Sequence, residues 1–269
     1  MSEYLTFNVQ QLEKYASYFA LFFTKEGILV NAEKQTPLIS FASTQIMLNA
    51  QIEAAYLCHA VLIVRCKITL SEEQLLSLGF RVFAIRPFLA QASTHLRQLT
   101  LKAYHWLNWD KQSCYCGQCG SPLKRKIDAT DKWCDNCQSA FFPRFSPAIM
   151  VLIQRENEIL LARSKHFAPG MYSAIAGFID IGETAEVAVH REVHEEVGIY
   201  ISHLKYFSSQ TWPFPDSFMI AFKAHYASGD LKIDDNEIED ARWFSLDALP
   251  NLPSRPSIAR RLIDSVTKK

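Results

Sequence analysis

Apolar residues along this chain group into segments whose spacing predicts strands and helices. In the N-terminal third, residues 15–23 and 54–70 are apolar and β-branched enough to predict strands. Residues 71–80, SEEQLLSLGF, begin with a capping serine and end near a glycine, which predicts a short helix. Residues 96–112 place apolar side chains at helical spacing, as in an amphipathic connecting helix. This part of the chain is therefore predicted to form a small mixed α/β domain.

The C-terminal half carries a longer series of predicted elements. A helix is predicted over residues 185–197, because Thr184 can cap its start and Gly198 can end it. A polar turn, RENE, separates the first two strands. Strands are predicted at residues 149–153, 159–162, 173–179, 204–212, 217–227 and 241–244, and a closing helix at residues 257–269.

Four of the five glutamates in the segment 177–199, GFIDIGETAEVAVHREVHEEVGI, are grouped around an arginine as Glu183, Glu192, Glu195 and Glu196. On the predicted helix, Glu192, Glu195 and Glu196 fall within an arc of about 100°, beside a stripe of valines that would be buried. Only Arg191 offers a local counter-charge, so the remaining negative charge requires a cation. Hard divalent ions such as Mg²⁺ or Mn²⁺ suit carboxylate ligands. The alternative for a cluster of this kind is a solvated acidic helix face.

The whole segment resembles the Nudix box at every defining position. This resemblance implies an α+β fold, with a catalytic domain built as an α/β/α sandwich. It also implies hydrolysis of a nucleoside diphosphate linked to another group. The matching positions are Gly177, Glu183, Arg191, Glu192, Glu195, Glu196, Gly198 and the aliphatic residues Val193 and Ile199.

Length, composition and charge limit the classes of protein that remain. The chain has 269 residues, of which 49% are hydrophobic and 21% charged, as expected for two domains, or two plus a small insert. Its formal net charge is zero, which gives no global electrostatic reason to bind nucleic acid or a membrane surface. The N-terminus lacks a basic segment followed by an apolar run, and no apolar stretch approaches 18 residues. These features predict a cytoplasmic protein without a membrane partner.

Four of the seven cysteines form two CxxC pairs, and 14 residues lie between the two pairs. Cys116 with Cys119, and Cys134 with Cys137, have nearly the usual spacing of a zinc ribbon, in which four thiolates close a tetrahedral shell. The pattern predicts one structural Zn²⁺ per chain, and disulfides or redox thiols are the alternative. Cys114 lies close enough to compete as a ligand, but Cys116 alone completes the first pair.

A second signature, SQTWPFPDS at residues 209–217, follows the Nudix-like segment. Its two prolines predict a rigid extended loop that fixes the directions of Trp212 and Phe214, although such a loop can also be a plain surface turn. The NADH pyrophosphatase branch of the Nudix family is similar, with a motif SQPWPFPxS after the box and a four-cysteine ribbon before it. Thr211 stands where that pattern has proline, and the rest of the motif is retained.

The resemblance implies that the protein splits NADH or NAD⁺ into nicotinamide mononucleotide and AMP. It also implies action on NAD-capped RNA and assembly as a homodimer. The predicted domains are a mixed α/β domain at residues 1–110, a zinc ribbon at 111–142 and a Nudix domain at 143–269. A non-catalytic nucleotide-sensing or RNA-binding module remains the alternative.

The resemblance also implies roles for individual residues. The implied catalytic residues are Arg191, Glu192, Glu195 and Glu196, and either Glu195 or Glu196 is the base. Arg191 either braces the loop through Glu183 or forms a simple surface pair with it. Glu239 is a rival to Glu237 as the distal metal ligand, and an acidic contact in the ribbon falls near Ala129. The implied ligands of Mg²⁺ or Mn²⁺ are Ala176 (through its carbonyl), Glu192, Glu195, Glu196 and Glu237. The implied substrate-binding residues are Phe142, Gln210, Thr211, Trp212, Pro213, Phe214, Pro215, Asp216, Ser217 and Ala259.

Overall fold

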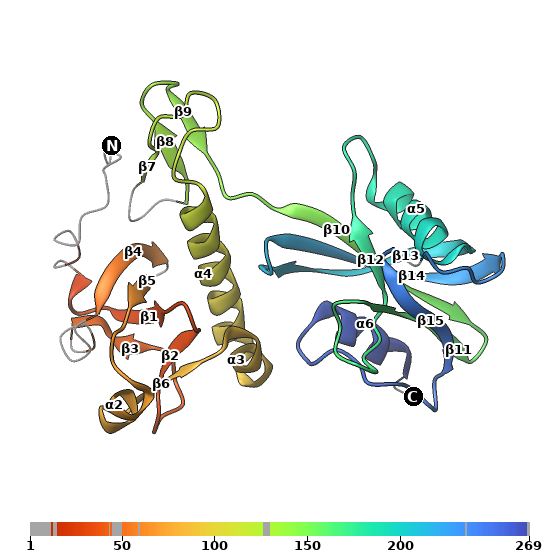
Figure 1. The fold of residues 1–269 in the computed structure, drawn as a ribbon, viewed down its shortest axis with the longest axis horizontal. Coiled ribbons are helices and arrows are strands. Elements are labelled where there is room, and N and C mark those ends of the chain that lie inside the picture. The colour runs from red at the N-terminus through yellow and green to blue at the C-terminus, as the bar shows by residue number, and fades with distance from the viewer. Residues whose placement is uncertain are drawn as a thin grey trace. The chain divides into compact units, whose positions relative to one another are not determined.

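The chain folds as two compact units, Met1–Arg144 and Phe145–Lys269 (Figure 1). The structure is a computed structural model that describes residues 12, 15–42, 44, 50–58, 60–125, 130–234 and 236–267. The finer division into three domains, with boundaries after residues 110 and 142, stays a prediction. Among the helices in the described part of the chain, none combines the length and apolar composition needed to cross a bilayer.

A six-stranded sheet forms the base of the N-terminal unit. Its strands are β1 (Phe19–Phe23), β2 (Ile28–Asn31), β3 (Ile39–Ser40), β4 (Gln51–Cys58), β5 (Val61–Lys67) and β6 (Phe80–Phe83). The order is β4-β5-β1-β2-β6, with β3 paired to β1, and the pair β1 and β5 is parallel. The predicted strand at 15–23 begins only at Phe19, and the predicted segment 54–70 covers parts of two strands, β4 and β5. β2, β3 and β6 are absent from the prediction because none exceeds four residues.

Helices and a second sheet accompany this sheet in the described part of the unit. Helix α2 (Glu72–Ser77) begins at a capping box between Ser71 and Gln74, as the sequence predicts. Helix α3 (Ile85–Gln91) is not predicted, whereas α4 (Thr94–Gln112) matches the expected amphipathic helix. After α4 the chain forms a three-stranded sheet of β7 (Lys124–Arg125), β8 (Lys132–Cys134) and β9 (Ser139–Phe141).

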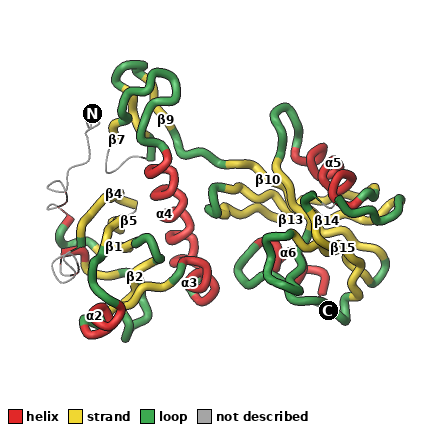
Figure 2. Tube along the Cα trace, in the orientation of Figure 1, coloured by secondary structure: helices red, strands yellow, loops and turns green. Residues whose placement is uncertain are grey.

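The C-terminal unit is an α/β/α sandwich, which confirms the predicted fold class (Figure 2). Its sheet has the order β13-β14-β10-β11-β15, with β12 paired to β10. Each strand and helix predicted in this half has a counterpart. The strands are β10 (Ser146–Arg155), β11 (Glu158–Ser164), β12 (Ile175–Phe178), β13 (Tyr200–Trp212), β14 (Ser217–Ser228) and β15 (Ile238–Ser245), and the helices are α5 (Ala185–Val197) and α6 (Ile258–Thr267).

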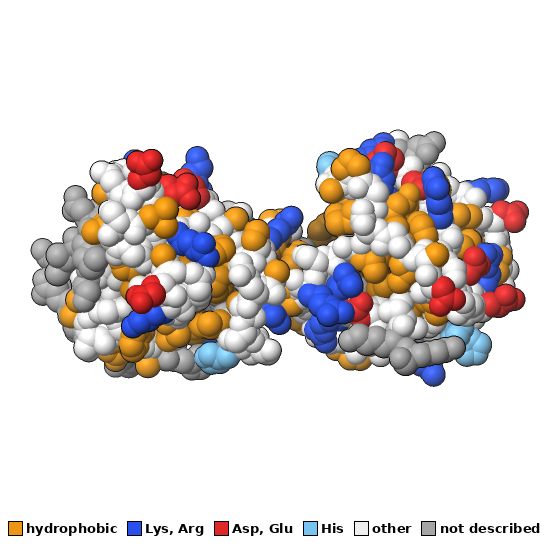
Figure 3. Space-filling view, turned by 90° about the horizontal axis from the view of Figure 1, so that it is seen from below, with side chains coloured by type: hydrophobic (Ala, Val, Ile, Leu, Met, Phe, Trp, Pro, Cys, Tyr) orange, Lys and Arg blue, Asp and Glu red, His pale blue; other side chains and the backbone are white. Residues whose placement is uncertain are grey.

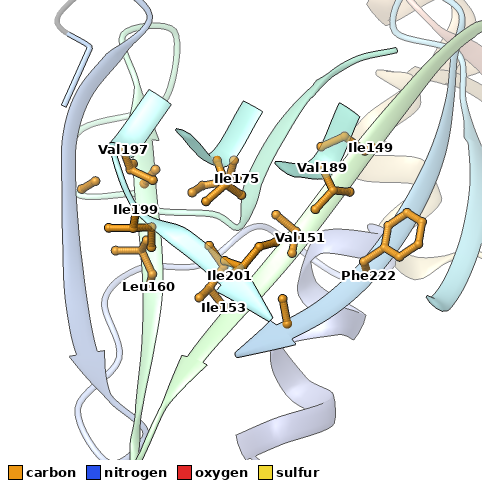
Figure 4. Close-up of a cluster of buried hydrophobic side chains, with 14 of the residues drawn as sticks. Ile149, Val151, Ile153, Leu160, Ile175, Val189, Val197, Ile199, Ile201 and Phe222 are labelled. Carbon is orange, nitrogen blue, oxygen red and sulfur yellow. The ribbon is translucent and has the colours of Figure 1, made fainter. Parts of the chain in front are cut away.

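Alternate residues of β10 belong to the two hydrophobic cores that lie on opposite faces of the sheet. Ile149, Val151 and Ile153 pack with the buried valines of α5, as Figure 4 shows. Met150 and Leu152 pack on the opposite face with α6. Because successive side chains of a strand point to opposite faces, one apolar strand supplies both layers. The sheet thereby fixes the position of α5, which carries the glutamates.

The predicted loop at residues 209–217 is shorter in the structure. β13 continues through Trp212 and β14 starts at Ser217, and these two residues are paired across the hairpin. Only residues 213–216 form the turn. Antiparallel pairing extends into the motif because the two long strands keep their hydrogen bonds up to the prolines.

Candidate active site

Helix α5 starts and ends where the sequence predicts. The side chain of Thr184 accepts a hydrogen bond from Val187 N at 3.3 Å, and Gly198 has φ +71° at the C-terminal cap. Val189 and Val193 are fully buried against the sheet. The helix therefore presents its glutamates at the edge of a rigidly packed face.

Three carboxylates meet at this edge. Oxygen atoms of Glu192, Glu196 and Glu237 all lie within 4.8 Å of one another. Glu192 and Glu196 are buried on α5, and the exposed Glu237 comes from the turn that precedes β15. Such a group of acceptors without a donor among them is the ligand set that hard divalent cations prefer.

Glu196 shows the need for a cation most clearly. Its Oε2 atom is buried and has no hydrogen-bond partner among the described residues. Burial first, and then the charges of Glu192 and Glu237, raise the pKa of Glu196 from 4.5 to about 8. A buried carboxylate with an orphaned oxygen fits a metal ligand, because a bound cation would satisfy both the atom and the charge.

Gly177 makes room for the carboxylate of Glu192. It lies in β12 opposite Ile149, and a Cβ atom at this position would lie 2.0 Å from Glu192 Cδ. The glycine is thus required by close approach rather than by its backbone angles. Burial is also the main cause that raises the pKa of Glu192. Ala176, whose carbonyl is a predicted ligand, directly precedes this glycine in β12.

Arg191 holds the loop and the helix together. Its Nε and Nη2 atoms donate to the two oxygens of Glu183 at 2.7 and 2.8 Å, as a bidentate pair. Nη2 also donates to Phe178 O, and Nη1 donates to Glu192 and Glu195 at 2.9 Å each. The hydrogen bonds from Arg191 lower the pKa of Glu183 to about 2. This geometry favours the brace over the simple surface pair.

Glu195 lies apart from the three-carboxylate group. Its side chain is 58% exposed and is paired with Arg191. Its role as ligand or base stays a prediction. Of the two rivals in the acidic segment, Glu237 joins Glu192 and Glu196, whereas Glu239 forms an ion pair with Arg163 on β11.

The four predicted zinc ligands form a second cluster, in the N-terminal unit. All four sulfur atoms lie within 4.8 Å of one another. The Sγ atoms of Cys116 and Cys137 are 3.8 Å apart, and those of Cys119 and Cys134 are 3.5 Å apart. A tetrahedral Zn²⁺ with bonds of about 2.3 Å needs sulfur atoms about 3.8 Å apart, so these thiols fit the ion. Cys114 lies outside the cluster, with its sulfur near the carbonyls of Asp110 and Lys111.

The predicted substrate residues of the C-terminal unit lie on the β13–β14 hairpin and at the start of α6. Gln210 Nε2 donates to Pro256 O at 3.2 Å, and its Oε1 accepts from Ile258 N at 2.6 Å. The side-chain amide thus anchors α6 to β13. Ala259 lies in the first turn of that helix and is buried in the core.

The hairpin end itself is held by local contacts. The rings of Trp212 and Phe214 meet edge to face with centroids 5.1 Å apart. Asp216 Oδ1 accepts from Ser146 Oγ at 2.9 Å, which fixes the turn to the start of β10. The structure therefore brings together eight predicted residues at this end of the sheet, namely Gln210, Thr211, Trp212, Pro213, Phe214, Pro215, Asp216 and Ser217.

Two predicted contacts lie in the N-terminal unit. Phe142 follows β9 and is 64% exposed, so its ring is free of the core of that unit. The position near Ala129 falls outside the described residues.

A buried ion cluster around Asp110 is missing from the sequence-based prediction. Asp110, on α4, is bonded by Arg125 at 2.6 Å, by Lys132 at 2.7 Å and by Arg65 at 3.3 Å. Burial raises the pKa of Asp110, but Arg125 and Lys132 outweigh it and lower the pKa overall. Because these cations come from β5, β7 and β8, the cluster ties the cysteine ribbon to α4 and to the large sheet. An aspartate inside an amphipathic helix, such as Asp110 in the 96–112 segment, is the only signal in the sequence.

Comparison with known proteins shows which family the chain resembles. Residues 144–266 match the NUDIX domain. A protein named NAD-capped RNA hydrolase NudC from Chromobacterium violaceum is 55% identical over 149 residues, which cover 55% of this chain and 56% of that protein. Proteins of the same name are similar in Stutzerimonas stutzeri (46% identity over 69% of this chain and 67% of that protein) and Pseudomonas syringae pv. tomato (42% identity over 77% and 69%). In the first of these relatives the match spans little more than half of the protein.

Proposed function

The chain belongs to the Nudix family, and from this membership we propose that it hydrolyses the pyrophosphate of NADH or NAD⁺ in a metal-dependent reaction. The products are nicotinamide mononucleotide and AMP. The observation that carries the proposal is the group of Glu192, Glu196 and Glu237, in which the buried Oε2 of Glu196 lacks a partner among the described residues. NAD-capped RNA presents the same pyrophosphate, and the names of the relatives support it as a second substrate.

The residues of the site have different roles in the proposed hydrolysis. When bound, Mg²⁺ or Mn²⁺ would neutralise charge on the pyrophosphate and make a water molecule more nucleophilic. Glu192, Glu196 and Glu237 would hold the ion, with the Ala176 carbonyl as a further oxygen ligand. Glu195, which is exposed and accepts a hydrogen bond from Arg191, is a candidate to accept the proton of the attacking water, and Glu196 is the other candidate. Arg191 keeps Glu192 and Glu195 in one arrangement with the loop that carries Glu183.

Dinucleotide binding is assigned to the hairpin end and the start of α6. Trp212 and Phe214 are half-buried aromatic side chains at the turn, and aromatic rings stack on nucleotide bases. Phe142 belongs to the N-terminal unit, and its role as a substrate contact is supported by the family resemblance alone; its ring is exposed and lacks the hydroxyl of a tyrosine. Gln210, in contrast, is already occupied by α6, which supports a role in shaping this surface.

Three finer assignments complete the proposal. The four-cysteine cluster holds one structural Zn²⁺, supported by its sulfur spacing. The family resemblance supports a homodimer in the cytoplasm. On the face seen in Figure 3, acidic and basic side chains are interspersed on each unit.

Product analysis tests the proposed function. The zinc-loaded full chain is incubated with NADH and Mn²⁺ or Mg²⁺, and AMP with reduced nicotinamide mononucleotide are the expected products. Rates on NAD-capped RNA of the same concentration then rank the two substrates. Folded protein that binds NADH without releasing AMP would instead support the non-catalytic sensor.

Replacement of Gly177 by alanine is expected to impair the site without unfolding the protein. The added methyl group would overlap the Glu192 carboxylate, while the backbone of Gly177 is compatible with alanine. We expect the rate of NADH hydrolysis to fall by at least about 10-fold, because misplaced ligands weaken metal binding. Gly117→Ala is the matched control, since a Cβ there meets nothing within 4 Å. Equal rates for both variants and the wild type would show that Glu192 need not lie against β12.

A further inference from the structure

Asp234 lies between the two elements that supply the metal-binding glutamates. Helix α5 carries Glu192 and Glu196, and the third member, Glu237, stands outside it, directly before β15. A group formed by distant segments keeps its geometry only if something fixes one segment to the other. Two sets of hydrogen bonds, in each of which Asp234 takes part, provide that connection.

The first set joins Asp234 to the end of α5. Its backbone N–H donates to Glu196 O at 3.0 Å, and Lys232 N donates to Val197 O at the same distance. The last carbonyls of a helix have no partner within the helix, so a neighbouring segment of the chain can bind them. Here the bound carbonyl belongs to a residue whose carboxylate is part of the metal group.

The second set fixes the turn that leads to Glu237. The carboxylate Oδ1 of Asp234 accepts from Asn236 N at 3.0 Å and from Asn236 Nδ2 at 2.8 Å. Its carbonyl accepts from Glu237 N at 3.2 Å and from Ile238 N at 3.0 Å. The buried Ile238 then anchors the start of β15 in the core beside α5. Asp234 therefore defines the direction in which the Glu237 side chain leaves the turn.

We propose that Asp234 is a positioning residue for the metal site, which holds Glu237 in register with Glu196 without binding the ion itself. The proposal rests on the proposed function, because it takes the three carboxylates as the site of Mg²⁺ or Mn²⁺. The role of the Asp234 side chain is geometric, because it accepts two hydrogen bonds in the turn, and its charge is not required. An asparagine can perform that task with its own Oδ1 atom, and an alanine cannot.

Mn²⁺ binding to the full chain, measured by the loss of the free-ion EPR signal, tests this role. Asp234→Ala is expected to bind Mn²⁺ about 10-fold to 100-fold more weakly than the wild type, the usual cost of losing a residue that orients ligands. Asp234→Asn is expected to restore the affinity to within about 3-fold, because the turn survives and only the charge is lost. Asp230→Ala removes an exposed charge from the same segment outside the turn and serves as the control.

The outcomes separate this role from a general loss of stability. Thermal unfolding of each variant shows whether the protein is folded at the temperature of the measurement. Wild-type affinity in Asp234→Ala, or equally weak binding in Asp234→Asn and Asp234→Ala, would overturn the positioning role. Failure of the proposed function has a different signature, since the wild type would then bind Mn²⁺ without releasing AMP from NADH. Absence of Mn²⁺ binding in the wild type would overturn both.

Discussion

Glu196→Gln is expected to lower the rate of NADH hydrolysis by more than about 100-fold, because loss of an outer partner of a metal ligand alone costs about 10-fold to 100-fold. Glu196 is the most buried of the three carboxylates. Glutamine has nearly the same shape, so the helix and its core should be unchanged. The variant retains the surface that is assigned to the dinucleotide. Steady-state rates with Mn²⁺, together with NADH binding by calorimetry, separate lost turnover from lost binding.

The same substitution is expected to stabilise the protein when no divalent cation is present. The pKa of Glu196 is about 8 in the folded chain and 4.5 in the reference state. Between these values the folded protein retains a proton that the unfolded chain has released, so stability falls as the pH rises from about 4.5 to about 8. Glutamine removes this dependence, and at pH 8 the gain should be on the order of 5 kcal/mol, since the two pKa values differ by about 3.5 units and each unit is worth about 1.4 kcal/mol.

Urea unfolding at pH 5 and pH 8, in protein dialysed free of Mg²⁺ and Mn²⁺, measures the stability difference. Glu239→Gln is the matched control, because that side chain lies in the same acidic region but pairs with Arg163. The control should retain activity and the pH dependence of the wild type. Normal turnover in Glu196→Gln, or an unfolding free energy with the same fall between the two pH values, would contradict the description of this carboxylate.

Helix α5 could be predicted from the sequence because its signals are local. Thr184, the valine stripe and Gly198 act within a few residues, and the structure confirms both ends of the helix. The four cysteines could be grouped for the same reason, since two CxxC turns place their sulfur atoms whatever the rest of the fold does.

The choice between Glu237 and Glu239 could not be made from sequence alone. It depends on the pairing of β11 with β15, in which Arg163 lies opposite Asp240, and on the turn at Asp234. The cluster around Asp110 could not be predicted from the sequence for a similar reason. Its cations are 15 to 45 residues away in sequence, and nothing local to α4 indicates that they converge on it.

The second large effect is expected in the N-terminal unit, where Cys134→Ser should abolish zinc binding. Cys134 is fully buried in β8, and the strands β7, β8 and β9 have only two or three residues each. Sheets this small do not fold on the strength of their own core. Binding of structural Zn²⁺ is worth about 10–16 kcal/mol in isolated zinc-binding peptides, so its loss should unfold the ribbon.

The damage should spread beyond the ribbon because of Asp110. Lys132 lies two residues before Cys134 and donates to Asp110 and to the carbonyl of Ser113. Unfolding of β7 and β8 would withdraw Lys132 and Arg125 from this buried carboxylate, leaving it with Arg65 and the hydroxyl of Tyr56. A buried charge that loses its partners costs about 3–5 kcal/mol. The melting temperature of the N-terminal unit is therefore expected to fall as zinc is lost.

Metal analysis and circular dichroism of the full chain check both steps. The wild type should carry one zinc per chain, and Cys134→Ser should carry none and melt at a lower temperature. Cys114→Ser is the matched control, because the Cys114 sulfur lies near backbone carbonyls outside the four-sulfur group. Zinc retained in Cys134→Ser, or wild-type protein that is folded without zinc, would refute the ribbon. Loss of zinc with an unchanged melting temperature would show instead that Asp110 keeps its partners, and that α4 and the large sheet are stable without the metal.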